Sequence, residues 1–180
     1  MKPVKAAVLS TILSISCMAN THANARDMRP PTPACVVHAA VSHHLPLTVI
    51  LALMRTEGGH PGTVHPNYDK HGRVFSYDLG VMQINNTTWL PEIAQRDFGG
   101  NQKLAWETIR DNGCYNVMWG AEIFSRYVDE AQGRYWLAVG YYNSHTLGPR
   151  ITYTRQVARR FMEVMSDLKK YGVIASNKSG

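Results

Sequence analysis

The chain has 180 residues, which is enough for one domain with a sizeable core and gives no reason to expect two. It carries 19 lysines and arginines against 13 acids, a formal net charge of +6. The basic residues are scattered, with no run longer than the pairs at residues 159–160 and 169–170. Because no basic stripe with interleaved aromatic residues is present, we expect no nucleic-acid partner.

The first 25 residues have the pattern of a secretory signal peptide. Residues 1–5 are basic at two positions, residues 6–19 are mostly small and apolar, and residues 23–25 form an A-x-A cleavage site. We therefore expect cleavage near Ala25 and an exported, periplasmic protein. The loss of two lysines and no acid leaves a net charge of +4. A retained anchor and lipidation at Cys17 are the alternatives, although the apolar segment is too short for a stable membrane span.

Two cysteines remain once the segment that carries Cys17 is removed. An even pair in an oxidising compartment favours a disulfide, here between Cys35 and Cys114, which are 79 residues apart. A bond that closes so long a loop is expected to stabilise the fold by roughly 4–5 kcal/mol. Two buried free thiols are the alternative.

The N-terminal part is predicted to be extended and then helical. Residues 26–33 form a stiff, proline-rich leader. The apolar spacing predicts a helix over residues 34–45. The inner side of that helix is predicted to contain Cys35, Val36, Ala39, Ala40 and Val41. A second helix, over residues 47–57, is apolar nearly all round, so we expect it to be buried centrally.

The second predicted helix ends in a carboxylate. Glu57 is its last residue, and Gly58-Gly59 follow it, as glycine commonly does after a helix C-terminus. The negative end of the helix dipole and the apolar core both disfavour an ionised carboxylate, so the pKa of Glu57 is predicted to be raised. A solvated glutamate at a helix end is the alternative.

A long polar segment follows at residues 60–77. It is rich in Gly, Pro, Asn, Asp and His, and loops of this length in compact domains are often functional. A short strand is predicted at residues 73–77, after a turn at residues 69–72. We expect the segment to be a flap over a binding groove. Its histidines match no metal-ligand spacing, so we expect no metal and no cofactor.

The remainder is predicted to be helical. Helices are expected from residue 86 or 87 to 94, over 103–110, 116–130 and 134–142, and from 149 or 150 to about 170. The buried side of the last helix is predicted to contain Ile151, Tyr153, Val157, Phe161, Val164, Met165 and Leu168. Residues 173–180 form a flexible tail. The sum is a mostly α single domain with a long loop or small β ribbon after the central helix.

Few carboxylates are placed to do chemistry. The chain has no serine-nucleophile elbow, HExxH zinc motif, phosphate-binding loop or dinucleotide fingerprint. Glu57 and Asp78 are the one acid pair that we consider for a cleft. Other acids are expected at exposed positions: Asp97, Asp111, Asp129 and Glu130. Asp78 could instead cap a turn or accept hydrogen bonds from loop N–H groups.

Two amides and a tyrosine are further candidates. Gln83 follows apolar or small residues, so its amide either meets a sugar hydroxyl or N-acetyl group or braces the loop. Tyr142 and Asn143 close an aromatic helix. They either face a ligand groove or, in the case of the tyrosine, fill the core.

Five pieces of sequence occur in a specific order. They are Glu57 after an apolar helix, DLGVMQIN at 78–85, WLP at 89–91, CYNV at 114–117 with GA at 120–121, and WLAVGYYN at 136–143. Together they resemble the soluble lytic transglycosylase domain, with its goose-type lysozyme-like fold. The likeness covers about residues 35–157. It is greater to the small exported transglycosylases that accompany conjugation and type III or type IV secretion machines.

The resemblance implies a lysozyme-like domain over residues 34–172, with Glu57 as the single catalytic acid. It implies a sugar-binding cleft that contains Gln83, Asn85, Tyr142 and Asn143. It also implies the disulfide between Cys35 and Cys114 that cysteine counting favours independently.

Two departures from the family pattern bear on the cleft. Gly58 stands where the family usually has a serine, so no hydroxyl contact to the acid is expected from that position. Ser144-His145 stand where the family often has Ala-Gly, and these larger residues either narrow or extend the groove.

The implied reaction cleaves peptidoglycan glycan strands between N-acetylmuramic acid and N-acetylglucosamine. It forms 1,6-anhydro ends without water, with Glu57 as general acid and then base, and with Tyr142 orienting the acid or the sugar. The implied setting is local cell-wall remodelling for a type III or type IV secretion apparatus or a conjugation apparatus. A lysozyme-type hydrolase, in which Asp78 positions a water, and a non-catalytic peptidoglycan-binding assembly factor are the alternatives.

Overall fold

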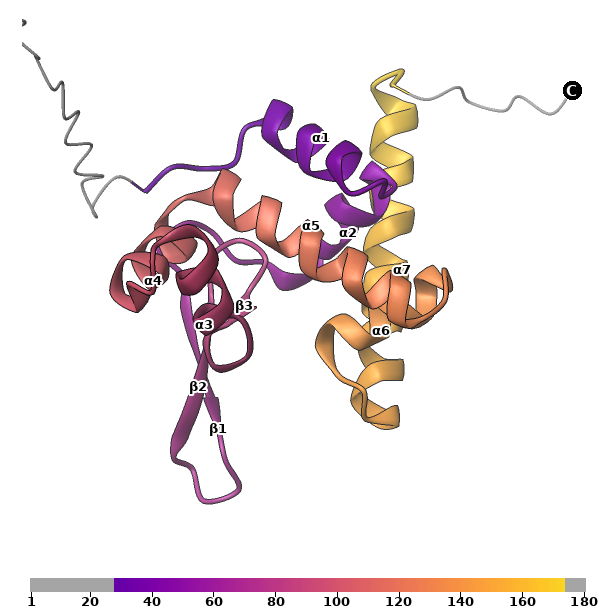
Figure 1. Cartoon of the computed structure of the whole chain (residues 1–180). Helices are drawn as coiled ribbons and strands as arrows, with labels where there is room; N and C mark the ends of the chain where they lie inside the picture. Colours follow the sequence, from indigo (N-terminus) through magenta and orange to yellow (C-terminus); the bar gives the residue numbers. More distant parts are fainter. Residues whose placement is uncertain (1–27, 174–180) are drawn as a thin grey trace, which may run out of the picture.

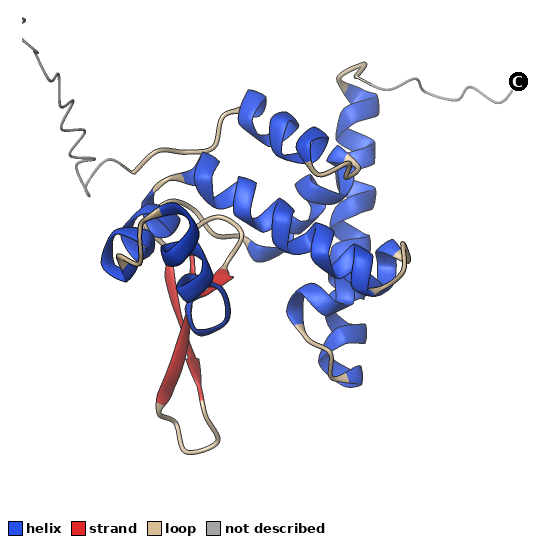
Figure 2. Ribbon diagram, viewed as in Figure 1, coloured by secondary structure: helices blue, strands red, loops and turns tan. Residues whose placement is uncertain are grey.

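The structure is a computed structural model that describes residues 28–173. Most of these residues are helical, which confirms the prediction of a mostly α chain with a small β ribbon (Figures 1 and 2). The elements are α1 (Pro33–Ser42), α2 (Leu47–Glu57), β1 (Val64–Tyr68), β2 (Val74–Leu79), β3 (Ile84–Asn85), α3 (Asn86–Asp97), α4 (Gln102–Asp111), α5 (Gly113–Glu130), α6 (Tyr135–Asn143) and α7 (Leu147–Lys170). The predicted signal peptide and most of the predicted tail lie outside the described residues.

The central helix α2 has the bounds that its sequence predicts. Pro46 precedes its first turn, where a missing N–H costs nothing, and Val49, Ile50, Ala52 and Leu53 are buried. Gly58 ends the helix in the left-handed conformation, with φ of 63°, and its N–H donates to the carbonyl of Met54 at 3.1 Å. Glu57 therefore stands on the last turn of a buried helix.

The polar segment after α2 is a β-hairpin that projects from the helical body (Figures 1 and 2). Strands β1 and β2 pair antiparallel, and the Asp69 carboxylate closes the turn by accepting from the N–H groups of His71 and Arg73. The predicted strand at 73–77 is thus present, shifted and extended to Val74–Leu79. Strand β1 was not predicted, because Pro66 and its polar neighbours do not have strand-forming character.

The loop between β2 and β3 connects the sheet to the helical body, and one buried amide holds this loop in place. Asn116 of α5 is fully buried; its amide oxygen accepts from the N–H of Met82 at 2.7 Å. Its amide nitrogen donates to the carbonyls of Leu79 and Ile109, each at 2.9 Å. One side chain therefore connects α4, α5 and the loop that leads to β3.

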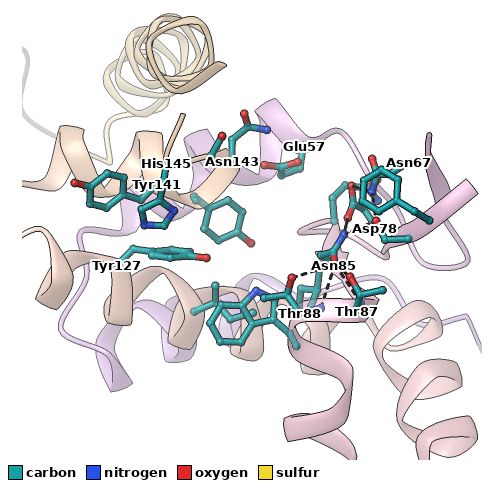
Figure 3. Close-up of a pocket in the computed structure, with 18 residues that line it drawn as sticks. Glu57, Asn67, Asp78, Asn85, Thr87, Thr88, Tyr127, Tyr141, Asn143 and His145 are labelled. Carbon is teal, nitrogen blue, oxygen red and sulfur yellow. Dashed lines mark hydrogen bonds between the residues drawn. The ribbon is translucent and has the colours of Figure 1, made fainter. Parts of the chain in front are cut away.

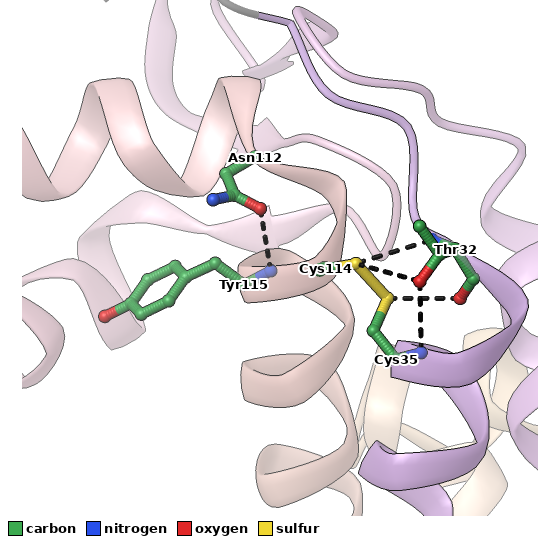
Figure 4. The surroundings of a disulfide bond; sticks show 5 residues. All are labelled: Thr32, Cys35, Asn112, Cys114 and Tyr115. Atoms are coloured by element: carbon green, nitrogen blue, oxygen red, sulfur yellow. Dashed lines mark hydrogen bonds between the residues drawn. A yellow bond between two sulfur atoms is a disulfide. The ribbon is translucent and has the colours of Figure 1, made fainter. Parts of the chain in front are cut away.

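A disulfide joins Cys35 of α1 to Cys114 of α5, as the cysteine count favours (Figure 4). The two Cα atoms are 5.7 Å apart. The Thr32 side chain caps α1 by accepting from the Cys35 N–H at 3.2 Å, and Asn112 caps α5 by accepting from the Tyr115 N–H at 3.1 Å. The Asn112 cap explains why α5 begins three residues before its predicted start.

Three predictions about burial were wrong. Val41 is 66% exposed and Ile151 is 41% exposed, because both lie on the outer sides of their helices. Asp111, expected at the surface, is only 6% exposed. Its two carboxylate oxygens each accept from the guanidinium of Arg110 at 2.6 Å, an ion pair that makes its burial tolerable.

Helix α7, the longest described element, packs against α2 and α6 at the edge of the molecule opposite the hairpin (Figure 1). Its first turn begins at Leu147, slightly earlier than predicted. Tyr153, Val157 and Val164 face the core, as expected. Between residues 28 and 173 no single helix is long and apolar enough to cross a membrane, although α1 and α2 together would be if they did not meet at a bend of 119°.

Candidate active site

A cleft of about 390 Å³ opens between the hairpin and α3 on one side and α5 and α6 on the other (Figure 3). It contains every sequence-predicted cleft residue: Glu57, Gln83, Asn85, Tyr142 and Asn143. These residues come from α2, the loop before β3, β3 itself and α6, so distant parts of the chain meet here. The walls are largely polar, with aromatic rings from α3, α5 and α6 among them.

Glu57 is the half-buried acid of this cleft. Burial raises the pKa of its carboxyl from 4.5 to about 7. A hydrogen bond from Tyr153 opposes that rise, and the negative charge of Asp78 adds to it. Desolvation dominates because the carboxyl stands at the end of an apolar helix, as its place in the sequence suggests. At neutral pH this group can therefore both give and take a proton.

The partner of the acid is Tyr153, which the sequence indicated only as a core residue. Its hydroxyl, on the buried side of α7, donates to Oε1 of Glu57. Burial raises the pKa of Tyr153 well above its usual value, so the hydroxyl remains a neutral donor. A buried tyrosine usually needs a hydrogen-bond partner, which is the one hint that the sequence offered.

Tyr142 lies in the cleft wall but does not hydrogen-bond the acid. Its hydroxyl donates to the carbonyl of Met82 at 3.0 Å, and its ring packs edge-on against Phe124 and Tyr127. Tyr142 therefore braces the loop before β3 against α6. The orienting role that the family resemblance suggested for it is, toward the acid, filled by Tyr153.

Asp78 faces the cleft from β2 within a set of side-chain amides (Figure 3). Its Oδ1 accepts from Nδ2 of Asn85 at 2.7 Å, and its Oδ2 accepts from Nδ2 of Asn67 at 2.9 Å. Both amides also donate to the hydroxyl of Ser76 at 3.1 Å. Asp78 thus neither caps a turn nor accepts from loop N–H groups, but fixes the amides of two strands.

Asn85 is almost fully occupied by contacts within the protein. Besides the bonds of its nitrogen, its Oδ1 accepts from the backbone N–H groups of Thr87 and Thr88, at 3.1 and 3.2 Å, and so caps α3. It also accepts from the hydroxyls of both threonines. Its place in the cleft is therefore mainly that of a residue that shapes the wall.

Gln83 has the loop-bracing contact that is one of the two interpretations its sequence left open. Its backbone has φ of 48°, an unusual value for a residue other than glycine, and its Nε2 donates to the carbonyl of Gly80 at 2.7 Å. The side chain thus braces the loop. It also lines the cleft, where its amide can meet a ligand.

His145, just beyond the end of α6, extends this wall of the cleft. The ring of His145 stacks on Tyr141, with centroids 4.3 Å apart and planes 17° apart. Its Nε2 lies 2.8 Å from Oε1 of Glu130, and the edge of Tyr127 packs against it. His145 lines the cleft next to exposed Asn143, so its ring adds bulk to this wall.

Several other cleft residues were not predicted as such from the sequence. They lie in the hairpin, in β3, in the first turn of α3, and in α5 and α6: Asn67, Phe75, Ser76, Ile84, Thr87, Thr88, Trp89, Ile123, Tyr127 and Tyr141. Ile84, Trp89 and Tyr141 belong to the motifs at 78–85, 89–91 and 136–143, and the hairpin residues have polar positions with β-strand spacing. Within residues 28–173, no group of three or more His, Cys, Asp or Glu side chains is placed to hold a metal ion.

Sequence comparisons relate this chain to known proteins. Residues 34–158 match the family described as "Transglycosylase SLT domain". The chain is 27% identical over 112 residues to the "Peptidoglycan-binding-like protein" of Escherichia coli O157:H7. This match covers 62% of this chain and 64% of that protein, so the chain spans less than two thirds of that relative. The chain is also 25% identical over 140 residues to "Protein IpgF" of Shigella flexneri, and this match covers 76% of this chain and 84% of IpgF.

Proposed function

Because this chain belongs to the transglycosylase SLT domain family, we propose that it is a peptidoglycan lytic transglycosylase in which Glu57 is the single general acid and base. The observation that carries the proposal is the half-buried Glu57 carboxyl in the cleft, with a pKa of about 7 and a neutral tyrosine donor beside it. A carboxyl of this kind is populated in both protonation states near neutral pH, as an acid that later becomes a base requires.

The reaction follows from that one group. Protonated Glu57 donates its proton to the oxygen between N-acetylmuramic acid and N-acetylglucosamine as the bond to C1 breaks. The resulting carboxylate then accepts the proton of the muramic C6 hydroxyl while that oxygen bonds to C1. The products are a 1,6-anhydro-muramic end and a free N-acetylglucosamine end, and Glu57 is again protonated.

The hydrogen bond from Tyr153 to Glu57 assists the second step, in which the ionised carboxylate accepts a proton. A hydrogen bond to a carboxylate stabilises the ionised form, so Tyr153 favours the state in which Glu57 has given up its proton. It also holds the carboxyl in one orientation relative to the cleft. Positioning of this kind is what allows a single acid to act on two oxygens in turn.

The substrate contacts that we propose depend on which polar atoms each side chain does not already use in hydrogen bonds within the protein. Asn143 is exposed at the end of α6, and Gln83 lines the cleft. Tyr142 offers its ring and Asn85 mainly its position, since protein contacts use their polar atoms. Asn143 and Gln83 are therefore the proposed polar contacts to N-acetyl groups and hydroxyls.

We also propose that the protein is exported and acts on the cell wall during assembly of a type III or type IV secretion or conjugation apparatus. The signal-peptide pattern, the disulfide and the peptidoglycan substrate implied by the family support export. The role in an apparatus rests on the sequence resemblance alone.

Glu57→Gln tests the assignment. The variant keeps the shape and the hydrogen-bond acceptor but cannot cycle a proton, so release of soluble muropeptides from sacculi should fall by at least about a hundredfold. Glu163→Gln, at an exposed position of α7, is the matched control and should digest sacculi as the parent does. Equal digestion by Glu57→Gln and the parent would refute the role of Glu57. Sacculus binding by the parent without soluble product would favour the non-catalytic assembly factor.

A further inference from the structure

The outer face of α7 is positively charged and lies away from the active site. The helix contains six basic residues and two acids over 24 residues. Both acids are turned to its flanks and paired. Glu163 bonds Arg160 at 3.0 Å, and Asp167 bonds Arg55 of α2 at 2.7 Å. The acids therefore do not neutralise the outer face.

Four cations gather on that face: Arg155, Arg159, Lys169 and Lys170. All are exposed, and none forms an ion pair with an acid of the described chain. At about 100° per residue, they lie within about 60° of the direction opposite the buried side of the helix. From Arg155 to Lys170 they extend over about 22 Å along the axis.

Apolar side chains are interspersed with these cations. Ile151 is 41% exposed and Met162 is 67% exposed, and both lie on the same outer face. Tyr171 and Val173, just beyond the C-terminus of the helix, are 73% and 65% exposed. A polyanion would need only the charges. A face that mixes cations with exposed apolar and aromatic side chains matches the interface of an anionic lipid bilayer.

We propose that α7 lies along the surface of a bilayer that contains anionic phospholipid. Arg155, Arg159, Lys169 and Lys170 would contact the headgroups, and Met162 would enter the boundary between headgroups and acyl chains. Tyr153, on the opposite side of the same helix, bonds to Glu57. Lipid binding would therefore turn the cleft away from the bilayer and toward the cell wall. This last consequence rests on the proposed function, whereas the lipid binding does not.

Co-sedimentation with vesicles tests the proposal. The chain from Arg26 to Gly180 is mixed with vesicles of phosphatidylcholine alone or with about one-third phosphatidylglycerol. We expect binding only to the anionic vesicles and release at high salt. Arg155→Gln/Arg159→Gln should lower the partition coefficient about 25-fold, at about fivefold per cation. Lys70→Gln/Lys103→Gln removes the same charge from exposed positions of the hairpin turn and α4, and should lower it less than twofold.

Two further variants make the outcome specific. Met162→Ser should lower binding to anionic vesicles several-fold and leave binding to soluble polyphosphate unchanged. Glu57→Gln should bind vesicles as the parent does, so a failure of the catalytic assignment can be distinguished from a failure of this proposal. Equal losses in the two double variants, no preference for anionic vesicles, or no effect of Met162→Ser on vesicle binding would each overturn the proposal. The last result, with tight polyphosphate binding, would indicate a polyanionic partner instead.

Discussion

At the scale of single residues, the site depends on an acid whose proton affinity is set by opposing effects. Burial of Glu57 at the end of a helix favours the neutral form, and the charge of Asp78 adds to this. The Tyr153 hydroxyl favours the ionised form. The balance places the pKa of Glu57 at about 7, where a small environmental change alters which form predominates.

The pH dependence of the reaction should report that balance. The first step needs protonated Glu57, so kcat/KM should fall about tenfold per pH unit once the pH rises above about 7. Tyr153→Phe removes the bond that stabilises the carboxylate. The pKa of Glu57 should then rise further, and the falling limb should move to higher pH.

The same variant separates positioning from simple structural damage. With the carboxyl no longer held, kcat of Tyr153→Phe should fall about tenfold to a hundredfold while KM changes little. Tyr171→Phe, at an exposed position beyond α7, is the control and should show the parent profile. A Tyr153→Phe enzyme with the parent pH limb would show that the Tyr153 hydroxyl does not act on Glu57.

At the scale of elements, the loop between β2 and β3 is held by the buried amide of Asn116. Asn116→Ala leaves the Met82 N–H and the Leu79 and Ile109 carbonyls without this partner. We expect the free energy of unfolding to fall by about 2–4 kcal/mol. Activity should also fall, because Met82 and Gln83 are part of this loop and Gln83 lines the cleft.

Chemical denaturation of Asn116→Ala measures the loss directly. Asn101→Ala is a matched control, because Asn101 only caps α4 by accepting from the N–H of Leu104, at 3.0 Å, on an exposed turn. That variant should lose about 1 kcal/mol and retain activity. Similar losses in the two variants would show that Asn116 does not secure the loop.

Elements defined by local chemistry were predictable, and those defined by distant contacts were not. The bounds of α2 follow from Pro46, an apolar run and Gly58, all of which act within a few residues. Strand β1 contains Pro66 and forms only because β2 lies beside it. The Tyr153 contact joins residues 96 positions apart, and nothing near either residue specifies it.

At the scale of the whole molecule, the disulfide links α1 to the first turn of α5, and neither cysteine lines the cleft. It closes a loop of 79 residues, which contains α2, the hairpin and α3. The loop includes Glu57, Asp78, Gln83 and Asn85. The bond therefore limits the unfolded chain over the segment that supplies most of the cleft residues.

Replacing both cysteines by serine should lower the free energy of unfolding by about 2–5 kcal/mol. Because neither sulfur lines the cleft, activity at room temperature should remain, and the temperature of inactivation should fall. Thermal inactivation of the variant and of the parent, with and without reductant, checks this. Titration of two free thiols in the denatured, unreduced parent would contradict the disulfide itself.

The mostly α character and the places of Glu57, Gln83, Asn85, Tyr142 and Asn143 in the cleft could be predicted, because apolar spacing and ordered motifs persist through the chain. The shape of the cleft could not. It depends on how α6 and the hairpin lie about α2, and on His145, whose stacking on Tyr141 and contact with Glu130 are tertiary. The flap expected at residues 60–77 is a hairpin whose Asn67, Phe75, Ser76 and Asp78 line one wall.

If Glu57 alone transfers the proton, no water enters the product. The most direct test is mass spectrometry of a sacculus digest made in water labelled with heavy oxygen. We expect muropeptides with 1,6-anhydro ends that contain no label, formed by the parent and absent with Glu57→Gln. Reducing muramic ends that carry the label would show instead that the enzyme is a hydrolase, with Asp78 as the first candidate to position its water.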